Sequence, residues 1–271
     1  MSDDQAVGTG VPHIFGRQLK RLRTWAGMGR AELGARTGYS ESTIASFEQG
    51  RRIPPRQFIG QADEVLDAHG VLLEFVEEME RAQYPPFFQD AAKLEKEAVA
   101  LHVFAVQGVP GLLQTEGYAR SVFNMWRPAL DEETIEQRVA ARLARQEIFT
   151  RKPMPTVSFV VEESVLRKRI GGESVARQQL EQILLVGRRR DVHLQVMPDD
   201  RDEHAAFGGP FTLIETMKGR RIAYVEAHTH SRLLTDRRTV RELEEQYSLL
   251  RAQALTPRES LAYVGKLLGE T

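Results

Sequence analysis

Two histidines separated by one residue, His228 and His230, are the first side chains whose spacing suggests chemistry. On a β-strand both would lie on one face, where two imidazoles can ligate a metal ion. The sequence contains no cysteine, and its spacing indicates no third ligand. We therefore interpret this segment as an edge strand or loop with polar histidines, and we expect no metal site.

Two adjacent carboxylates, Glu162 and Glu163, do not form a catalytic pair if they lie on a strand, because neighbouring strand residues point to opposite faces. The first turn of a helix explains them better. The glycine pairs in IGGES and FGGPF lack the spacing of phosphate-binding loops. No serine–histidine or carboxylate constellation stands out, so we expect no enzymatic activity and no cofactor.

The segment GYSESTIASFEQGRRIPP, residues 38–55, has a pattern suited to reading another molecule. Ser40 is a good helix N-cap, and Gly50 suits the position just past a helix C-terminus. Ile44 and Phe47 share one face of the helix between them. The opposite face carries small or hydrogen-bonding side chains, namely Glu41, Ser42, Ala45, Ser46 and Gln49. Such a face is either simply solvated or slim enough for a DNA major groove, which is about 12 Å wide.

The flanking residues predict the helices that must position this face. Apolar residues at helical spacing predict a helix over 13–26, and the glycines of GMG end it. A short helix over 30–37 and a turn at Gly38 then form, with the next helix, a helix-turn-helix pattern. Two further helices before residue 84 would complete a five-helix, all-α domain.

The net charge of −1 conceals an asymmetry between neighbouring segments. Residues 13–56 contain nine basic and three acidic side chains, whereas residues 57–100 contain three basic and ten acidic ones. A basic segment beside an acidic one favours an anionic partner for the first segment alone. A surface whose charges merely cluster along the sequence is the alternative.

The prolines of YPPFFQD mark a break, because a helix cannot continue through them. We predict a disordered tail over 1–12, a helix-turn-helix domain over 13–83, a linker over 84–92 and a second domain over 93–271. In the second domain we predict a helix over 91–105 and four strands at about 156–163, 192–198, 211–216 and 221–227. The fold class is α+β, with a mainly antiparallel sheet and flanking helices after the five-helix domain.

Residues 13–56 resemble the Xre-type, phage-repressor-like helix-turn-helix family, most clearly in AELGARTGYSESTIASFEQGRRIP. The order of the shared positions carries the resemblance: Leu33, Ala35, Gly38, Ser40, Ile44, Glu48, Gly50 and Pro54. The family's fold implies double-stranded DNA as a partner, with the second helix of the pair in the major groove.

The resemblance also implies roles for single residues. Arg30 stands where the family reaches a phosphate or a base, and Ser40 opens the DNA-facing helix. Base contacts are implied for Glu41, Ser42, Ala45 and Ser46. Contacts to the DNA backbone are implied for Thr43, Gln49, Arg51 and Arg52. Glu48 would tie the end of this helix to the first helix. Glu41 and Ser46 depart from the family, where an arginine is common, so the bases that are read do not follow from the resemblance.

The second half is similar to the C-terminal domain of WhiJ-like, antitoxin-like transcriptional regulators of actinobacteria. The similarity rests on VPGLLQTEGYAR, RLARQEIF, FVVEESVLRKRIGG, HAAFGGPFTLIE and AYVEAHTHSRLL. It implies transcription regulation with a small protein partner encoded nearby. A ligand-gated regulator with a small-molecule sensor domain is the alternative, and a protein-interaction module is a third.

We expect a homodimer, because a single module of this size contacts few base pairs. No apolar run approaches the roughly 20 residues of a membrane span, and the first ten residues have no apolar signal core. The expected location is therefore cytoplasmic, with no membrane partner. In the second domain, Tyr118, Val122, Phe123 and Trp126 form an apolar helix stripe that either packs on the sheet or is exposed to the partner.

Overall fold

A computed structural model of the chain describes residues 10–82, 89–205, 207–227 and 230–270. Most of the predicted tail and linker, and His228, lie outside these residues. The chain divides into two compact units, which we describe separately: a helical unit, Met1–Gln89 with Glu132–Gln137, and a sheet unit, Asp90–Asp131 with Arg138–Thr271.

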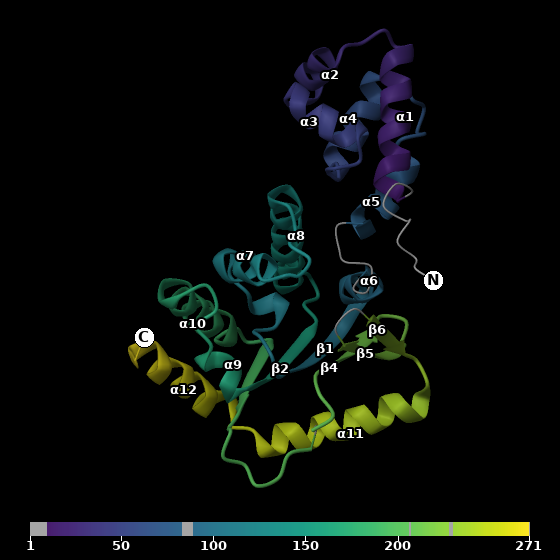
Figure 1. The fold of residues 1–271 in the computed structure, drawn as a ribbon. Helices are drawn as coiled ribbons and strands as arrows, with labels where there is room; N and C mark the ends of the chain where they lie inside the picture. Colours follow the sequence, from purple (N-terminus) through teal and green to yellow (C-terminus); the bar gives the residue numbers. More distant parts are fainter. Residues whose placement is uncertain (1–9, 83–88, 206, 228–229, 271) are drawn as a thin grey trace, which may run out of the picture. The chain divides into compact units, whose positions relative to one another are not determined.

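Residues 10–82 of the helical unit form five α-helices (Figure 1). Their bounds are α1 Val11–Trp25, α2 Arg30–Thr37, α3 Glu41–Glu48, α4 Arg56–Val65 and α5 Val76–Ala82. The helix α1 begins at Val11, two residues before the expected start. Each helix turns an apolar face inward, and together they enclose a core that includes Phe15, Leu19, Leu33, Ile44, Phe47, Phe58 and Leu72, all fully buried. Burial of one such side chain contributes about 1.5–3 kcal/mol, so packing rather than helix propensity holds these short helices.

The sheet unit is built on six strands in the order β3-β2-β1-β4-β5-β6. The strands are β1 Ala98–Ala105, β2 Thr156–Glu162, β3 Val192–Met197, β4 Phe211–Thr216, β5 Arg221–Ala227 and β6 His230–Leu234. The pairs β1–β2 and β2–β3 are parallel, whereas β1–β4, β4–β5 and β5–β6 are antiparallel. The sheet is therefore mixed, with a parallel half and an antiparallel half that meet at β1.

Helices cover both faces of this sheet, because its strands are apolar on both sides. The helices from residue 89 onward are α6 Gln89–Glu97, α7 Glu116–Asn124, α8 Glu132–Ala144, α9 Glu163–Arg167, α10 Glu173–Gly187, α11 Arg237–Gln253 and α12 Pro257–Glu270, and the first six residues of α8 belong to the helical unit. On one face, Val157 and Phe159 of β2 join a core with α7, α10 and α12. On the other face, Phe104 and Val160 pack against α11, which Figure 1 shows as a long helix running along the sheet.

The prediction of an α+β fold is confirmed, and the four predicted strands are present. The helix predicted over 91–105 is wrong in its second half, because α6 ends at Glu97 and β1 follows at once. Segment AVALHVFA is apolar on both faces as a central strand, and periodicity alone does not distinguish such a run from a buried helix. The helical stripe on α7 packs as core, with Tyr118 and Phe123 buried.

Candidate nucleic-acid interface

The turn between α2 and α3 is short and is built on a left-handed glycine. Gly38 closes α2 with φ of +79°, a conformation that costs little only without a Cβ. The chain then passes through Tyr39 and Ser40 directly into α3. This turn presents the N-terminal end of α3 at the surface, as a helix-turn-helix requires.

Ser40 caps α3 as the sequence predicts. Its Oγ accepts a hydrogen bond from the backbone N–H of Thr43 at 3.1 Å, and it lies 2.9 Å from the Ser42 hydroxyl and 2.8 Å from that of Thr43. A serine cap is worth about 1 kcal/mol relative to alanine, so this short helix depends on it. The three hydroxyls form one hydrogen-bonded cluster at the end of α3.

The inner face of α3 is locked into the core. Ile44 and Phe47 are fully buried. The ring of Phe47 lies 4.6 Å from that of Phe58, and Tyr39 packs edge-on against both rings, at 5.7 Å and 5.2 Å. Close packing of this kind fixes the rotation of α3 about its axis, and therefore which side chains face outward.

The outer face of α3 consists of the residues that the sequence singled out. Glu41, Ser42 and Gln49 are exposed, as is the cap Ser40. Thr43, Ala45 and Ser46 are partly exposed at its flanks. None of these side chains is a long aliphatic group, so the surface is slim and able to form hydrogen bonds. Its shape and chemistry suit base edges in a major groove.

Two exposed arginines follow the helix immediately. Gly50 adopts φ of +67°, and the backbone N–H of Arg51 returns to the carbonyl of Ser46 at 3.0 Å, which ends the helix. Arg51 and Arg52 therefore leave α3 at its C-terminal end, and the Arg52 Cζ lies 5.8 Å from the Phe47 ring centre. Arginines at this place can reach the phosphates that border a groove.

Glu48 connects three helices through a buried pair of salt bridges. Its side chain is 1% exposed; Oε1 lies 2.5 Å from Nε of Arg23 on α1, and Oε2 lies 2.7 Å from Nε of Arg30 on α2. Arg23 also donates from Nη1 to the carbonyl of Met28 at 2.6 Å. The predicted tie from Glu48 to the first helix is confirmed.

Sequence reasoning missed that Arg30 shares this carboxylate. The Arg30 side chain is 32% exposed, so its Nε is engaged by Glu48 while part of the side chain faces solvent. The spacing between Arg30 and Glu48 is nonlocal, and no periodic signal could have found it. Arg30 therefore positions α2 and α3 relative to each other, and its exposed part is what remains for a phosphate or a base.

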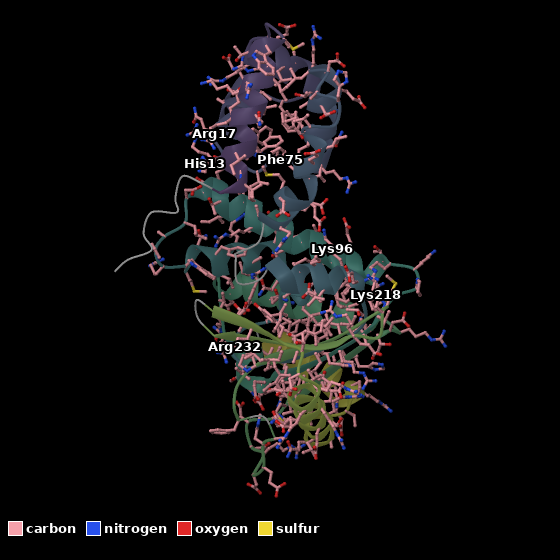
Figure 2. All side chains as sticks on the ribbon, turned by 90° about the vertical axis from the view of Figure 1, so that its right-hand side faces the viewer. His13, Arg17, Phe75, Lys96, Lys218 and Arg232 are labelled. Atoms are coloured by element: carbon pink, nitrogen blue, oxygen red, sulfur yellow. The ribbon has the colours of Figure 1, made fainter. Side chains whose placement is uncertain are left out.

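The helix α1 approaches α3 closely and shows cations to solvent. A Cβ on Gly16 would lie 2.4 Å from the carbonyl oxygen of Glu48, so only glycine fits there. Arg17, Lys20 and Arg21 are exposed on α1. Figure 2 shows Arg17 pointing outward from α1, whereas Phe75 points into the unit, where its ring packs against Phe15 at 5.7 Å.

In the sheet unit, the two glutamates considered above for catalysis form hydrogen bonds within the fold. His204 Nε2 lies 2.7 Å from Glu162 Oε1, and Glu163 accepts hydrogen bonds from Tyr263 at 2.6 Å and Arg167 at 2.9 Å. Burial opposes ionisation of Glu163, but these hydrogen bonds outweigh it and lower its pKa. His230 begins the edge strand β6, and the described residues contain no cluster of three potential metal ligands.

A serine–histidine contact does occur, although the sequence did not indicate one. His102 Nδ1 on β1 lies 2.6 Å from Ser158 Oγ on β2, which lies 2.9 Å from the hydroxyl of Tyr247 on α11. Ser158 is buried beneath α11. The three groups join that helix to the sheet, and reading β1 as a helix had concealed the pairing.

In the described residues no helix combines the length and the apolar character that a membrane span requires. The geometry of α2, α3 and the turn between them defines a helix-turn-helix protein, and residues 14–76 match the family model described as a helix-turn-helix domain. This match indicates a DNA-binding regulator. Residues 88–266 match the model described as Domain of unknown function (DUF5753). Since that match covers well over half of the sequence, the chain belongs to the DUF5753 family. No curated protein matches the sequence.

Proposed function

We propose that the protein is a sequence-specific, DNA-binding transcriptional regulator rather than an enzyme, acting in the cytoplasm. The observation that carries this proposal is the outer face of α3: a slim polar surface on a rigid core, ending in Arg51 and Arg52. Salt-sensitive contacts to phosphates supply affinity, and contacts to base edges supply specificity.

The roles within α3 are those that the resemblance to Xre-type regulators implies, and the exposure of these positions supports them. Glu41, Ser42, Ala45 and Ser46 face the bases in this proposal, and glutamate can accept a hydrogen bond from cytosine N4. Backbone contacts fall to Thr43, Gln49, Arg51 and Arg52. Ser40 holds the end of the helix that enters the groove, and Arg30 offers its exposed part to the DNA.

The proposal is tested by measuring how salt affects DNA binding. Genome-wide mapping or selection from random duplexes first supplies a bound site. Arg51→Ala and Arg52→Ala should each weaken binding about equally for specific and unrelated duplexes, and each should reduce the slope of log K against log salt by about 0.9 per lost phosphate contact.

Arg238→Ala is the matched control, because Arg238 is an exposed arginine of the sheet unit whose Nε lies 3.1 Å from Glu242 on its own helix. It should leave both affinity and salt slope unchanged. Altered base preference with an unchanged salt slope in Arg51→Ala or Arg52→Ala would contradict the phosphate assignment.

Specificity should depend on Ser42 and Ser46. Alanine at either position should change the preferred bases by about 1–3 kcal/mol of discrimination per lost contact. Ser46→Arg should tighten binding to all duplexes by adding a cation at the groove. An unchanged affinity and preference in all three variants, measured by competition, would place this face away from the DNA.

For the sheet unit we propose the role that the resemblance to Xre-type, WhiJ-like, antitoxin-like regulators implies: binding of a small protein encoded nearby. The edge strand β6 offers backbone groups for strand addition, which is one docking mode for such a partner. The full chain should co-purify with the product of the neighbouring gene, and the Arg51→Ala variant should retain the partner. Loss of the partner in that variant would instead assign it to the helical unit.

A ligand-gated regulator is the second candidate. The feature that favours it is a pair of arginines on α8: Arg142 stacks on Phe123 and donates to Gln114, and Nη1 of Arg138 is buried with no hydrogen-bond partner among the described residues.

A further inference from the structure

Three arginines recur along α8 and the 3-10 turn that follows it, Arg145–Thr150. Arg138, Arg142 and Arg145 stand four and then three residues apart, a spacing that places them on one helical face. Arg145 forms a bidentate pair with Glu95: its Nε and Nη2 donate to the two carboxylate oxygens at 2.8 Å and 2.7 Å. Both side chains of this pair are 10% exposed, so it is a structural salt bridge.

Arg142 has no such partner. Its guanidinium lies over the ring of Phe123 at 4.3 Å, and Nη1 donates to Gln114 Oε1 at 2.8 Å. In the described part of the chain the other donors of this guanidinium make no hydrogen bond, and no carboxylate lies within salt-bridge distance. A guanidinium has five donors in a planar fork, so most of its capacity is unused.

The surroundings of Arg142 disfavour its charge. Burial lowers its pKa to about 10, the charges of Arg145 and Arg138 act in the same direction, and Glu226 and Glu95 oppose them. Of these carboxylates, Glu95 is bound by Arg145. Glu226 accepts a hydrogen bond from Tyr224 at 3.3 Å. The residue nevertheless keeps partial exposure to solvent.

Arg138 repeats the pattern one turn earlier. Its Cζ lies 5.7 Å from the centre of the Trp126 ring, and its Nη1 is buried without a hydrogen-bond partner among the described residues. Burial lowers its pKa, and the charge of Asp131 opposes that effect. A buried donor without a partner is costly because it has given up its hydrogen bonds to water, so a fold rarely retains one without a use.

We propose that Arg142 and Arg138 form an anion-binding site of the sheet unit, which takes the carboxylate or phosphate group of a small molecule. The stack on Phe123 and the hydrogen bond to Gln114 hold the Arg142 fork in place before the ligand arrives. An oxyanion with two acceptor atoms would satisfy the unused donors and relieve the repulsion between the two cations. The site is independent of DNA binding by the helical unit.

Thermal melting of the full-length protein tests this site at constant ionic strength. Chloride is replaced stepwise by inorganic phosphate in one arm and by citrate in the other. We expect a saturable rise in melting temperature in at least one arm, and the responding arm identifies the anionic group. Arg142→Gln and Arg138→Gln should each weaken the response at least tenfold, whereas Arg238→Gln, an exposed arginine on α11, should keep it.

A response absent from the wild-type protein in both arms, or equal in Arg142→Gln and wild type, would overturn the proposal. The melting temperature without added anion is a second readout, which distinguishes an anion-binding role of Arg138 from a packing role. Without added anion, Arg138→Gln removes an unpartnered donor and should melt at the same temperature as wild type or higher. A clear fall would instead assign Arg138 to packing. Weaker binding of duplex DNA by Arg142→Gln would assign the anion to the DNA backbone, which would also overturn the small-molecule assignment.

Discussion

At the residue scale, Glu48 has the largest structural role in the candidate interface. One carboxylate receives guanidinium groups from two helices, and it lies at the end of the helix that we propose to enter the groove. A buried charge pair contributes little net stability compared with apolar packing, but removing one partner is costly because the other charge remains. Glu48 therefore sets the geometry of α1, α2 and α3 more than it adds to the free energy of unfolding.

Glu48→Gln should lower the free energy of unfolding by about 2–4 kcal/mol, because Arg23 would keep a charge with little solvent access. Arg30, which is partly exposed, should contribute less of this loss. Urea unfolding followed by circular dichroism measures the change. The control is Glu41→Gln, an exposed carboxylate on the same helix, which should change stability by less than about 0.5 kcal/mol. Equal effects of the two substitutions would show that the buried network does not hold the helices.

At the scale of elements, the close contact between α1 and α3 requires a glycine, Gly16, on α1. The backbone of Gly16 faces the carbonyls of Phe47 and Glu48, where a Cβ would lie 2.5 Å and 2.4 Å from the oxygens. Backbone atoms cannot rotate away as a side chain can, so the helices would have to separate.

Gly16→Ala should therefore destabilise the protein by about 1–3 kcal/mol, as overpacking in a core does. It should also weaken DNA binding, because α3 is displaced from its place on α1. Gly60→Ala is the matched control: this glycine lies within α4 with open space around it, so alanine should be neutral or stabilise by up to about 1 kcal/mol. Thermal melting and a duplex titration measure both effects. A stable, fully binding Gly16→Ala variant would contradict the close approach.

The attachment of α11 to the sheet should depend on pH through His102. Burial is the largest cause that lowers the pKa of His102, and the charges of Arg251 and His193 act in the same direction. Glu215 opposes them. The pKa of His102 is therefore lower in the folded chain than the ordinary value of 6.5 in the unfolded chain, so below pH 6.5 the unfolded chain binds the proton more readily. The contribution of neutral His102 to the free energy of unfolding is complete above about pH 6.5 and is lost as the pH falls.

Urea midpoints at pH 7.5 and pH 5.5 measure this dependence. His102→Gln should reduce the loss of stability between them, because it removes the titrating group while keeping a polar side chain beside Ser158 and Tyr247. His69→Gln is the control, since the His69 side chain is 81% exposed. It should leave the pH dependence unchanged. Identical pH profiles for His102→Gln and wild type would remove His102 from this role.

At the scale of the whole molecule, the size of the helical unit predicts how it meets DNA. One helix of eight residues, α3, reads few base pairs, which is too little for a unique site. We therefore expect two copies of the chain on a two-fold DNA site, with half-sites about 34 Å apart, one helical turn.

Sedimentation of the protein with and without duplex measures the number of copies in the complex, and footprinting measures the number and spacing of the half-sites. A dimer that protects two half-sites is the expected result. Sites whose half-site spacing is changed by half a helical turn should bind at least tenfold more weakly, because the two reading helices would face different sides of the duplex. A monomer that protects one half-site at working concentration would contradict the expectation.

The sequence alone determined the features that depend on neighbouring residues. The cap at Ser40, the left-handed glycines at Gly38 and Gly50, and the buried and exposed faces of α3 all follow from signals within a few positions. Strands β2 to β5 were also predictable, because alternating or continuous apolar runs bounded by turns are local patterns. The predictions failed where the pattern was ambiguous, as in β1, whose apolar run suits a buried helix equally well.

Only the tertiary structure decided what distant residues do together. The parallel pairing of β1 with β2 brought His102 to Ser158, 56 positions away, and the packing of three helices brought Arg23 and Arg30 to one carboxylate. The same holds for Arg142, whose contacts with Gln114 and Phe123 join residues 28 and 19 positions apart in the sequence. Spacing along the chain reports contacts within one helix or strand, whereas contacts between elements depend on how their faces pack, and no short stretch of sequence encodes that.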